Sequence, residues 1–443
     1  MSTALAPRSH GDYRSAVADG LPHPRAAALA PRGRDFAVAL REARQANGLS
    51  QRGLQRRSGL ASSDICRYEK GERTPTLEVA HVLDTVLQTG DELLKLARAA
   101  RRPSPAARSA PPYQLPAPPT ILVGRDRELA CLDAAARRAS TVVVDGMFGV
   151  GKTGLVRQWG HQGDPRERWP DGVLFADLRG YSPAGPPAEP TSVLGHLLRS
   201  LHVEDIPDDE QEQERAHLLR TVLADRRALI VLDDAANVEQ VRPLLSVGPD
   251  CTVLITARRR LPGLSIRDGA ARVPVEPLAI RAAALVLAAG TGWNVDNPAL
   301  AEIAAACDRL PLALHAAAVA IGDRAARPPA DVVAELTGAQ GLDVLTDAAA
   351  DDPASALRVV LAASYHRLPH SAARVLRTLA DVADDGEVTY TDLPRWLRDD
   401  DGDADAVTVL LREHLLTDTG RSVRIPGLLR RYLATATTEQ EVA

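Results

Sequence analysis

The sequence predicts a multidomain protein in which an all-α domain precedes an α/β domain with a parallel sheet, followed by a second helical region. Three observations predict this order. Residues 34–100 are patterned as helices throughout, and residues 101–119 contain seven prolines. After Ile121 short apolar strands alternate with helical stretches, as a mostly parallel sheet requires. A chain of 443 residues is long enough for about three domains.

Composition narrows the class of protein. The apolar content of 45% is sufficient for packed cores, although aromatic residues make up only 3%. The four cysteines are far apart in the sequence, which suits a reducing compartment better than a disulfide framework. No apolar run approaches the roughly 18 residues of a membrane span, and the first residues lack the apolar core of a signal peptide. We therefore expect a cytoplasmic protein without a membrane partner.

Charge is unevenly distributed along the chain. Between Arg32 and Arg102 there are 14 basic and 9 acidic residues, a local net charge of +5. Because the whole chain carries −5, the other residues carry −10. A basic N-terminal domain on an acidic body is typical of a protein that contacts nucleic acid near one end.

Two short helices are predicted in the N-terminal domain. Ser50 is placed to cap a helix that opens at Gln51, and Ser58-Gly59-Leu60 reads as a turn. A second helix is expected from Ser62 to a glycine cap at Gly71, and the next helix should begin after Thr74-Pro75-Thr76. The expected inward positions are Leu49, Leu54, Leu60, Ile65 and Tyr68.

The stretches LSQRGLQRRSGL and ICRYEKGERTPT resemble the XRE-type, or lambda-repressor-type, helix-turn-helix domain. In this fold the second helix enters the major groove of double-stranded DNA while the first crosses the backbone. The resemblance implies that Ser62, Ser63 and Arg67 face bases or phosphates and that Gln51 lies at the edge of the groove. The alternative is a small helical bundle that contacts a protein partner.

A nucleotide-binding motif follows the Pro-rich stretch. The apolar strand VVVD at 142–145 leads into Gly146-x4-Gly151-Lys152-Thr153, and a helix is expected to begin at Lys152. Such a loop closes backbone N–H groups around phosphates, the lysine reaches the β- and γ-phosphates, and the threonine hydroxyl binds Mg²⁺. The chain has 53 Lys plus Arg but only three lysines, so arginine is the usual basic residue here. A lysine at 152 is explained by its compact ammonium, which suits a phosphate. These residues predict binding of ATP or GTP.

Further motifs follow in a fixed order. VGRDREL at 123–129 precedes the P-loop, and LIVLDDA at 229–235 is a buried strand that delivers Asp233 beside it. VLITAR at 253–258 is a strand ending in Arg258, and CDRLPLAL at 307–314 starts a helix near Pro311. Strands are expected at 141–145, 173–177, 228–233, 251–256 and 272–275.

Over residues 120–338 this order of motifs resembles the NB-ARC class of STAND signalling NTPases, which includes actinobacterial transcription regulators. The resemblance implies ATP or ADP as the nucleotide, with Mg²⁺ held by Thr153 and Asp233. It also implies that Asp234 positions the attacking water, that Arg258 senses the γ-phosphate and that the Pro311 ring packs on adenine. The implied catalytic residues are Lys152, Asp233, Asp234 and Arg258, and the implied nucleotide-binding residues are Val123, Gly124, Arg125, Gly146, Gly149, Val150, Gly151, Lys152, Thr153, Gly154 and Pro311.

The C-terminal residues resemble the winged-helix domain of the same class, in SYHRLPHSAARVLRTLA from Ser364 and VRIPGLLRRYL from Val423. In that class a Met-His-Asp triplet precedes the last stretch, and its histidine contacts the β-phosphate of ADP. Here the aligned residues are Ile425-Pro426-Gly427, which provide no side chain for that contact. We therefore expect the closed ADP state to be held less firmly.

These readings together divide the chain into segments with defined bounds. We expect a disordered tail (1–31), a helix-turn-helix domain (32–100), a Pro-rich linker (101–119), an NB-ARC nucleotide-binding domain (120–278), a helical subdomain (279–345), a winged-helix domain (346–435) and a tail (436–443).

The predicted function is a DNA-binding transcriptional regulator switched by ATP and ADP, with slow hydrolysis as a timer. The nucleotide would alter oligomerisation or the exposure of the helix-turn-helix, and a dimer would favour a palindromic operator. The alternative is a STAND signalling or defence protein whose N-terminal domain recruits a protein. A P-loop ATPase with mechanical or metabolic work is disfavoured because no separate catalytic constellation is present.

Overall fold

A computed structural model describes residues 31–73, 75–101, 110–204, 206–207, 211–245, 247–324, 327–383, 386–397 and 403–442. The predicted N-terminal tail up to residue 30 and residues 102–109 of the predicted linker lie outside this range, as does Thr74. The chain divides into two units, residues 1–108 and residues 109–443. Within the described part, no helix is both long enough and apolar enough to cross a membrane.

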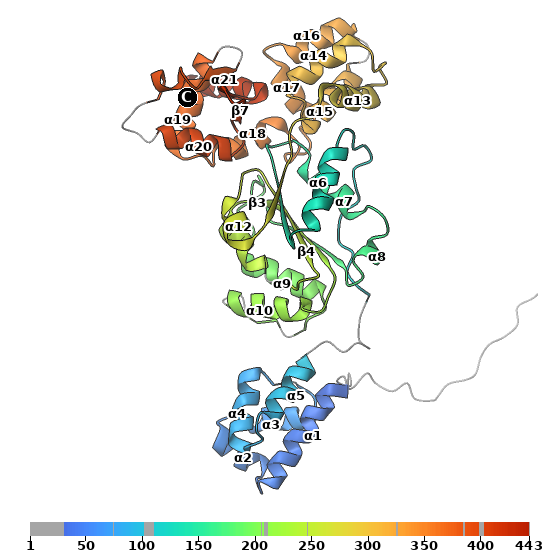
Figure 1. Cartoon of the computed structure of the whole chain (residues 1–443), viewed down its shortest axis with the longest axis vertical. Helices are drawn as coiled ribbons and strands as arrows, with labels where there is room; N and C mark the ends of the chain where they lie inside the picture. Colours follow the sequence, from blue (N-terminus) through green and yellow to red (C-terminus); the bar gives the residue numbers. More distant parts are fainter. Residues whose placement is uncertain are drawn as a thin grey trace, which may run out of the picture. The chain divides into compact units, whose positions relative to one another are not determined.

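The first unit is a bundle of short helices (Figure 1). They are α1 (Pro31–Ala46), α2 (Gln51–Ser58), α3 (Ser62–Glu69), α4 (Leu77–Leu87) and α5 (Glu92–Arg101). The Ser50 hydroxyl accepts from the Gly53 N–H and so caps α2, as predicted. Gly59 ends the helix with a left-handed backbone. Fully buried Leu54 and Ile65 fix α2 and α3 against the core of the bundle.

The second unit is built on a five-stranded parallel sheet. Its strands are β1 (Thr141–Asp145), β2 (Val173–Asp177), β3 (Leu229–Ala235), β4 (Thr252–Ala257) and β5 (Ala271–Pro274). The order across the sheet is β2-β3-β4-β1-β5. The prediction of a parallel sheet is therefore confirmed. Strand β4 lies between the strand that leads to the P-loop and the strand that carries Asp233.

Helices cover both faces of this sheet, and α6 and α7 are seen on one side of it in Figure 1. Alternating residues of a strand face opposite sides, so Val142 and Val144 of β1 join one core whereas Val143 joins the other. The first core includes α6 (Asp126–Ala136) and α7 (Lys152–Gly160), and the second includes α9 (Pro190–Ser200) and α10 (Glu212–Leu223). Shorter helices in this domain are α8 (Pro165–Arg168), α11 (Val238–Val241) and α12 (Pro262–Asp268), and η2 (Arg242–Leu245) is a 3₁₀ helix.

Part of the Pro-rich segment belongs to this sheet. Tyr113 forms a parallel bridge with Val173 of β2, and the Gln114 N–H donates to the Val173 carbonyl at 2.8 Å. Leu115 packs against the first core. The last residues of the predicted linker therefore extend the sheet edge, and their backbone groups are satisfied there.

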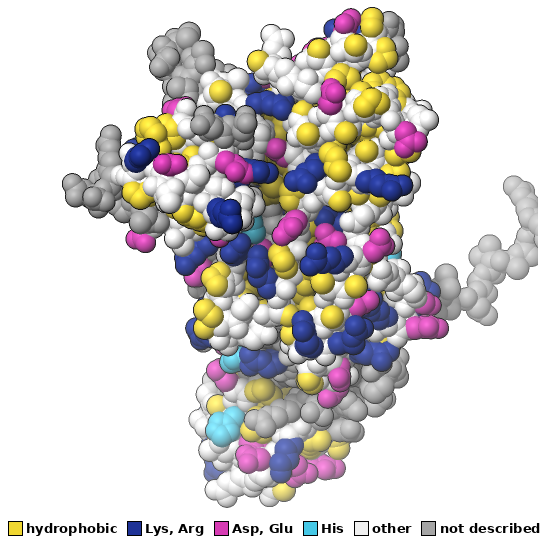
Figure 2. Space-filling model, turned by 45° about the horizontal axis from the view of Figure 1, so that its top comes forward, with side chains coloured by type: hydrophobic (Ala, Val, Ile, Leu, Met, Phe, Trp, Pro, Cys, Tyr) yellow, Lys and Arg dark blue, Asp and Glu magenta, His cyan; other side chains and the backbone are white. Residues whose placement is uncertain are grey.

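An alanine-rich helical region follows the sheet. It contains α13 (Ile280–Thr291), α14 (Pro298–Ala306), α15 (Pro311–Asp323), α16 (Pro329–Thr337) and α17 (Gly341–Asp347). Small residues let α13 and α15 approach closely, since a Cβ on Gly290 would lie 2.7 Å from the Ala318 Cβ. Hydrophobic side chains are numerous on its surface, at the upper right of Figure 2, and Val319 is 49% exposed.

The C-terminal region combines helices with a small antiparallel sheet. Its helices are α18 (Leu357–Tyr365), α19 (His370–Val382), α20 (Asp403–Arg412) and α21 (Gly427–Val442), with the 3₁₀ helix η3 (Leu393–Arg395). Strands β6 (Glu387–Thr389), β7 (Thr417–Asp418) and β8 (Ser422–Arg424) pair in the order β6-β8-β7. Helix α21 runs to Val442, past residue 435 where the last domain was expected to end. The winged-helix assignment stays a prediction.

Candidate functional site

The P-loop connects β1 to α7 through three glycines with positive φ. Gly146 has φ 159°, Gly149 has φ 64° and Gly151 has φ 97°. A Cβ at Gly146 would lie 2.3 Å from the Val275 carbonyl oxygen, so this position excludes every side chain. Gly151 is the N-cap of α7, whose free N–H groups form a natural site for an anion.

Lys152 is buried within this loop. Its Nζ donates to the carbonyls of Gly146 and Met147, both at 2.8 Å. Burial, with a smaller contribution from the Arg258 guanidinium, lowers the pKa of Lys152 to about 7. The ammonium thus bonds to its own loop, and phosphate oxygens are better acceptors for it than carbonyls.

A short network of oxygens joins α7, β3 and β4. The Thr153 hydroxyl donates to the Asp233 carboxylate at 2.9 Å, and the Thr256 hydroxyl donates to it at 2.6 Å. Burial raises the pKa of Asp233, although these two hydrogen bonds oppose the shift. Thr256 also accepts from the Asp234 N–H at 2.8 Å and so connects the two acidic residues. Thr153 and Asp233 present the oxygen donors that Mg²⁺ prefers, and they fit the predicted metal site.

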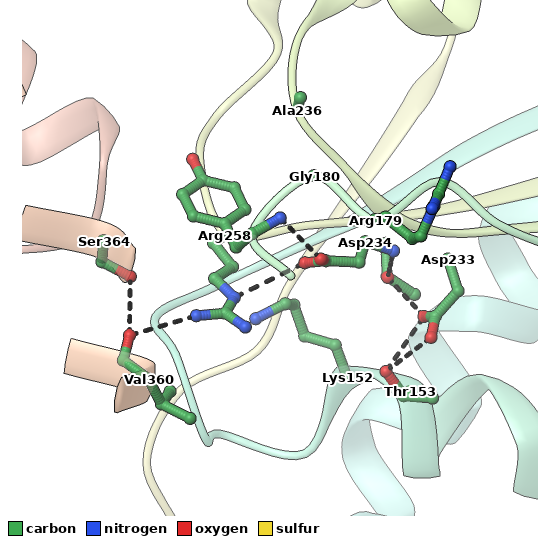
Figure 3. Close-up of polar contacts among 12 residues, drawn as sticks. Lys152, Thr153, Arg179, Gly180, Asp233, Asp234, Ala236, Arg258, Val360 and Ser364 are labelled. Carbon is green, nitrogen blue, oxygen red and sulfur yellow. Dashed lines mark hydrogen bonds and ion pairs between the residues drawn. The ribbon is translucent and has the colours of Figure 1, made fainter. Parts of the chain in front are cut away.

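Asp234 and Arg258 meet at the edge of the same site (Figure 3). The Asp234 carboxylate lies 3.5 Å from the Arg258 Nε and accepts from the Tyr181 N–H at 2.8 Å. Arg258 Nη1 donates to the Val360 carbonyl of α18 at 3.3 Å, and its guanidinium lies 4.9 Å from the Tyr181 ring centre. The predicted γ-phosphate sensor therefore contacts the C-terminal region directly.

These groups surround a pocket of about 390 Å³, which we call the nucleotide pocket. Two residues of α15 and two of α18 complete its wall: Pro311, Leu312, Val359 and Val360. Of the residues predicted from the sequence, it is lined by Gly149, Gly151, Lys152, Thr153, Asp233, Asp234, Arg258 and Pro311.

The other predicted nucleotide residues do not line this pocket: Val123, Gly124, Arg125, Gly146, Val150 and Gly154. Arg125 is buried and donates to the Val150 carbonyl at 2.7 Å and to the Glu276 carbonyl at 2.8 Å. It therefore supports the P-loop from outside. A Cβ on Gly124 would lie 2.6 Å from the Ala282 Cβ, so this glycine permits close packing on α13.

Three consecutive residues of the C-terminal region contact the parallel-sheet domain. The Arg412 carbonyl accepts from the Arg260 N–H at 2.8 Å, and the Glu413 carboxylate accepts from the Tyr181 hydroxyl at 3.0 Å. His414 Nε2 lies 2.9 Å from the Asp145 carboxylate, at the end of β1. We call residues 412–414 the docking segment. Sequence reasoning did not find it, nor Tyr181 and Thr256, because the motifs carry no signal for contacts this far apart in the chain.

Ile425-Pro426-Gly427 lies outside the lining of the nucleotide pocket. The N–H groups of Gly427 and Leu428 donate to the Asp308 carboxylate at 2.9 and 2.7 Å. Asp308 therefore caps the first turn of α21 from the helical region. Burial raises the pKa of Asp308 in spite of these bonds.

In the first unit, α3 presents Ser63 and Arg67 to solvent, and Ser62 is half-buried. Gln51 differs, because its Nε2 donates to the buried Glu69 carboxylate at 2.8 Å, which also pairs with Arg44. Its amide is thus used to join α2 to α3. Helix α2 adds three exposed arginines that were not predicted as contacts: Arg52, Arg56 and Arg57.

Comparison with known proteins identifies both domains. Residues 35–97 match the helix-turn-helix domain and residues 130–261 match the NB-ARC domain. The chain is 36% identical over 258 residues to the regulatory protein AfsR of Streptomyces griseus, covering 56% of this chain and 26% of that protein. It is 35% identical over 252 residues to AfsR of Streptomyces coelicolor, covering 54% and 24%. The chain thus spans about a quarter of the length of these relatives.

Among solved structures, a Walker-type ATPase of Pyrococcus abyssi superposes with a TM-score of 0.51 at 13% identity. The match covers 71% of this chain and 96% of that one. At this identity the likeness concerns the fold alone.

Proposed function

We propose that this chain, a helix-turn-helix domain joined to an NB-ARC P-loop NTPase domain, regulates transcription by binding double-stranded DNA under the control of ATP and ADP. The observation that carries the proposal is the position of Arg258. Its guanidinium contacts Asp234 on one side and the Val360 carbonyl of the C-terminal region on the other. A γ-phosphate would compete for this guanidinium, because a charge-assisted bond is stronger than one to a carbonyl. A bound triphosphate would therefore weaken the hydrogen bond between Arg258 and the Val360 carbonyl of α18.

The C-terminal region is the moving part in this proposal. We assign it as a winged-helix domain on its mixture of helices and a three-stranded antiparallel sheet. Its docking segment bonds to Arg260, Tyr181 and Asp145, which supports a closed arrangement in the absence of a triphosphate. The division of the chain into seven segments is part of the same proposal, and in it residues 279–345 form a helical subdomain.

Bound nucleotide would occupy the P-loop with Lys152 on its phosphates and Pro311 against its base. Mg²⁺, held by Thr153 and Asp233, would neutralise phosphate charge. We propose that hydrolysis is slow, because Asp234 is paired with Arg258 and bonded to the Tyr181 N–H instead of facing an attacking water.

The DNA-binding part of the proposal rests on the first unit. Arg67 and Ser63 of α3 are exposed on the helix that would enter the major groove, and α2 presents three arginines for phosphates. Relatives that are named regulatory proteins support this assignment. A cytoplasmic protein that dimerises on a palindromic operator follows from the proposal.

The test is selection of genomic DNA fragments by the full chain, loaded in parallel with ADP and with a non-hydrolysable ATP analogue. We expect one short palindrome whose enrichment changes with the nucleotide. Lys152→Ala should remove the nucleotide effect, whereas Arg67→Ala should weaken the enrichment. If neither nucleotide state enriches a sequence, the proposal is wrong and the first unit is a protein adaptor, as in a STAND signalling or defence protein.

A further inference from the structure

A second pocket, of about 850 Å³, shares no lining residue with the nucleotide pocket. Its wall includes Met147 of the P-loop, residues at the end of β5, the turn before α15 and the loop between β8 and α21. All three parts of the second unit therefore contribute to it. Its volume lies within the range of small-molecule sites.

The charge of this second pocket differs from that of the nucleotide pocket. Five arginines line it together with three carboxylates, Glu276, Asp308 and Asp418, and two of these arginines pair with carboxylates outside the lining, Arg272 with Asp145 and Arg424 with Glu387. The nucleotide pocket has Lys152 and Arg258 against three aspartates, a formal charge of −1. The whole chain carries −5. The second pocket therefore gathers five arginines from distant parts of an acidic chain, three of them without a carboxylate in an ion pair among the described residues.

Two of the three carboxylates of the second pocket are already hydrogen-bonded. Asp308 accepts from two backbone N–H groups at the start of α21, and Asp418 accepts from the Gly420 N–H at 2.7 Å. Among the described residues, the side chains of Arg260 and Arg309 have no ion-pair or hydrogen-bond partner. Arg260 interacts with Asp418, and Arg309 with Asp308, through charge alone. Their guanidinium N–H donors are therefore available to a ligand, and an arginine fork is suited to phosphate and carboxylate groups.

We propose that the second pocket binds a small polyanion, a phosphate ester or a polycarboxylate, without a metal ion. No described cluster of three or more His, Cys, Asp and Glu residues could hold a metal, and here the arginines themselves neutralise the ligand. The arginines come from the NTPase domain (Arg260, Arg272), the helical region (Arg309) and the C-terminal region (Arg424, Arg430). A bound polyanion bridges these parts and stabilises their arrangement. The inference stands whether or not DNA is the partner.

The experiment measures binding of pyrophosphate and, separately, of citrate to the full chain in EDTA, by calorimetry and by thermal unfolding. The two probes distinguish a phosphate ligand from a carboxylate ligand. The test variant combines Arg260→Gln with Arg309→Gln. If this double variant is unfolded, binding is measured on the single Arg260→Gln variant instead. Arg127→Gln is the matched control, because Arg127 is exposed on α6 and lines neither pocket. The Lys152→Ala variant distinguishes binding of a probe in the second pocket from binding at the P-loop.

We expect at least one probe to bind and to raise the unfolding temperature. Its affinity should fall by about tenfold or more in the arginine variants, as for the loss of charge-assisted hydrogen bonds. Affinity should be unchanged in Arg127→Gln, and binding should persist in Lys152→Ala. Three results would overturn the proposal: neither probe binds, binding is lost in Lys152→Ala, or Arg127→Gln weakens binding as much as the test variants do.

Discussion

Replacing Asp145 by asparagine should destabilise the second unit strongly. Asp145 is fully buried at the end of β1, immediately before the P-loop. Its carboxylate accepts from the Arg272 guanidinium at 2.5 and 2.8 Å, and His414 Nε2 lies 2.9 Å from it. The substitution keeps the size of the side chain and removes its charge, so Arg272 loses its counter-ion.

The expected loss follows from the exposure of the partners. Breaking a buried ion pair from one side costs about 3 to 5 kcal/mol. The Arg272 side chain is 38% exposed, so water recovers part of its solvation, and the lower end of this range applies. We therefore expect the free energy of unfolding to fall by about 3 kcal/mol, or roughly a 100-fold change in the equilibrium constant.

Urea unfolding followed by tryptophan fluorescence measures this loss. All four tryptophans, Trp159, Trp169, Trp293 and Trp396, belong to the second unit, so the signal is free of the first. Glu302→Gln is the control, because this carboxylate is exposed on α14 and should change stability by less than about 0.5 kcal/mol. A loss below about 1 kcal/mol for Asp145→Asn would refute the reasoning.

The difference in stability between wild type and Asp145→Asn should also depend on pH. Burial opposes ionisation, but the bonds from His414 and Arg272 prevail, and the pKa of Asp145 is lowered from its ordinary value of 3.8. A carboxylate with a lowered folded pKa contributes its stability above the unfolded value and loses it as the pH falls through the folded value. The difference between wild type and Asp145→Asn should thus shrink as the pH falls below about 4, through the folded pKa of Asp145. A constant difference down to pH 2 would contradict the assignment.

Three further predictions concern the nucleotide and DNA sites. Because the pKa of Lys152 is about 7 and phosphate requires the charged ammonium, ADP affinity should fall by up to about tenfold per unit above pH 7.5, and Lys152→Arg should flatten this profile. Thr256→Val removes a 2.6 Å bond to Asp233; it should slow Mg²⁺-dependent ATP turnover about tenfold while dialysis shows nucleotide binding retained. Arg67→Ala removes an exposed cation, so DNA affinity should weaken about tenfold by fluorescence anisotropy at unchanged stability.

Local sequence signals were sufficient for the N-terminal helices and for the parallel sheet. Apolar strands, glycines with positive φ and a serine cap each act within a few residues, which is why the helix beginning at Lys152 and the Ser50 cap agree with the structure. The P-loop and the Asp233 strand could be joined into one site because parallel strands deliver their carboxyl ends to the same edge.

The rest of the site depends on contacts that periodicity does not encode. Tyr181 and Glu413 are 232 residues apart, and His414 and Asp145 are 269 apart. Gln51 was predicted at the edge of the DNA groove from its place at the start of α2, and that stays a prediction; the sequence did not show that its amide bonds to the buried Glu69. Prolines at 111–119 suggested a spacer, whereas Tyr113 forms a bridge to Val173 at the sheet edge.

The chemistry of Lys152 offers a reporter that needs no engineering. The chain has three lysines, and the other two, Lys70 and Lys95, lie in the first unit, so the second unit contains a single ε-amine. A pKa near 7 makes that amine a nucleophile at neutral pH, while its position inside the loop shields it. Acylation of Lys152, read by mass spectrometry of the peptide that contains it, therefore measures how often the empty loop opens. Bound nucleotide should suppress that modification while leaving Lys70 and Lys95 as internal standards.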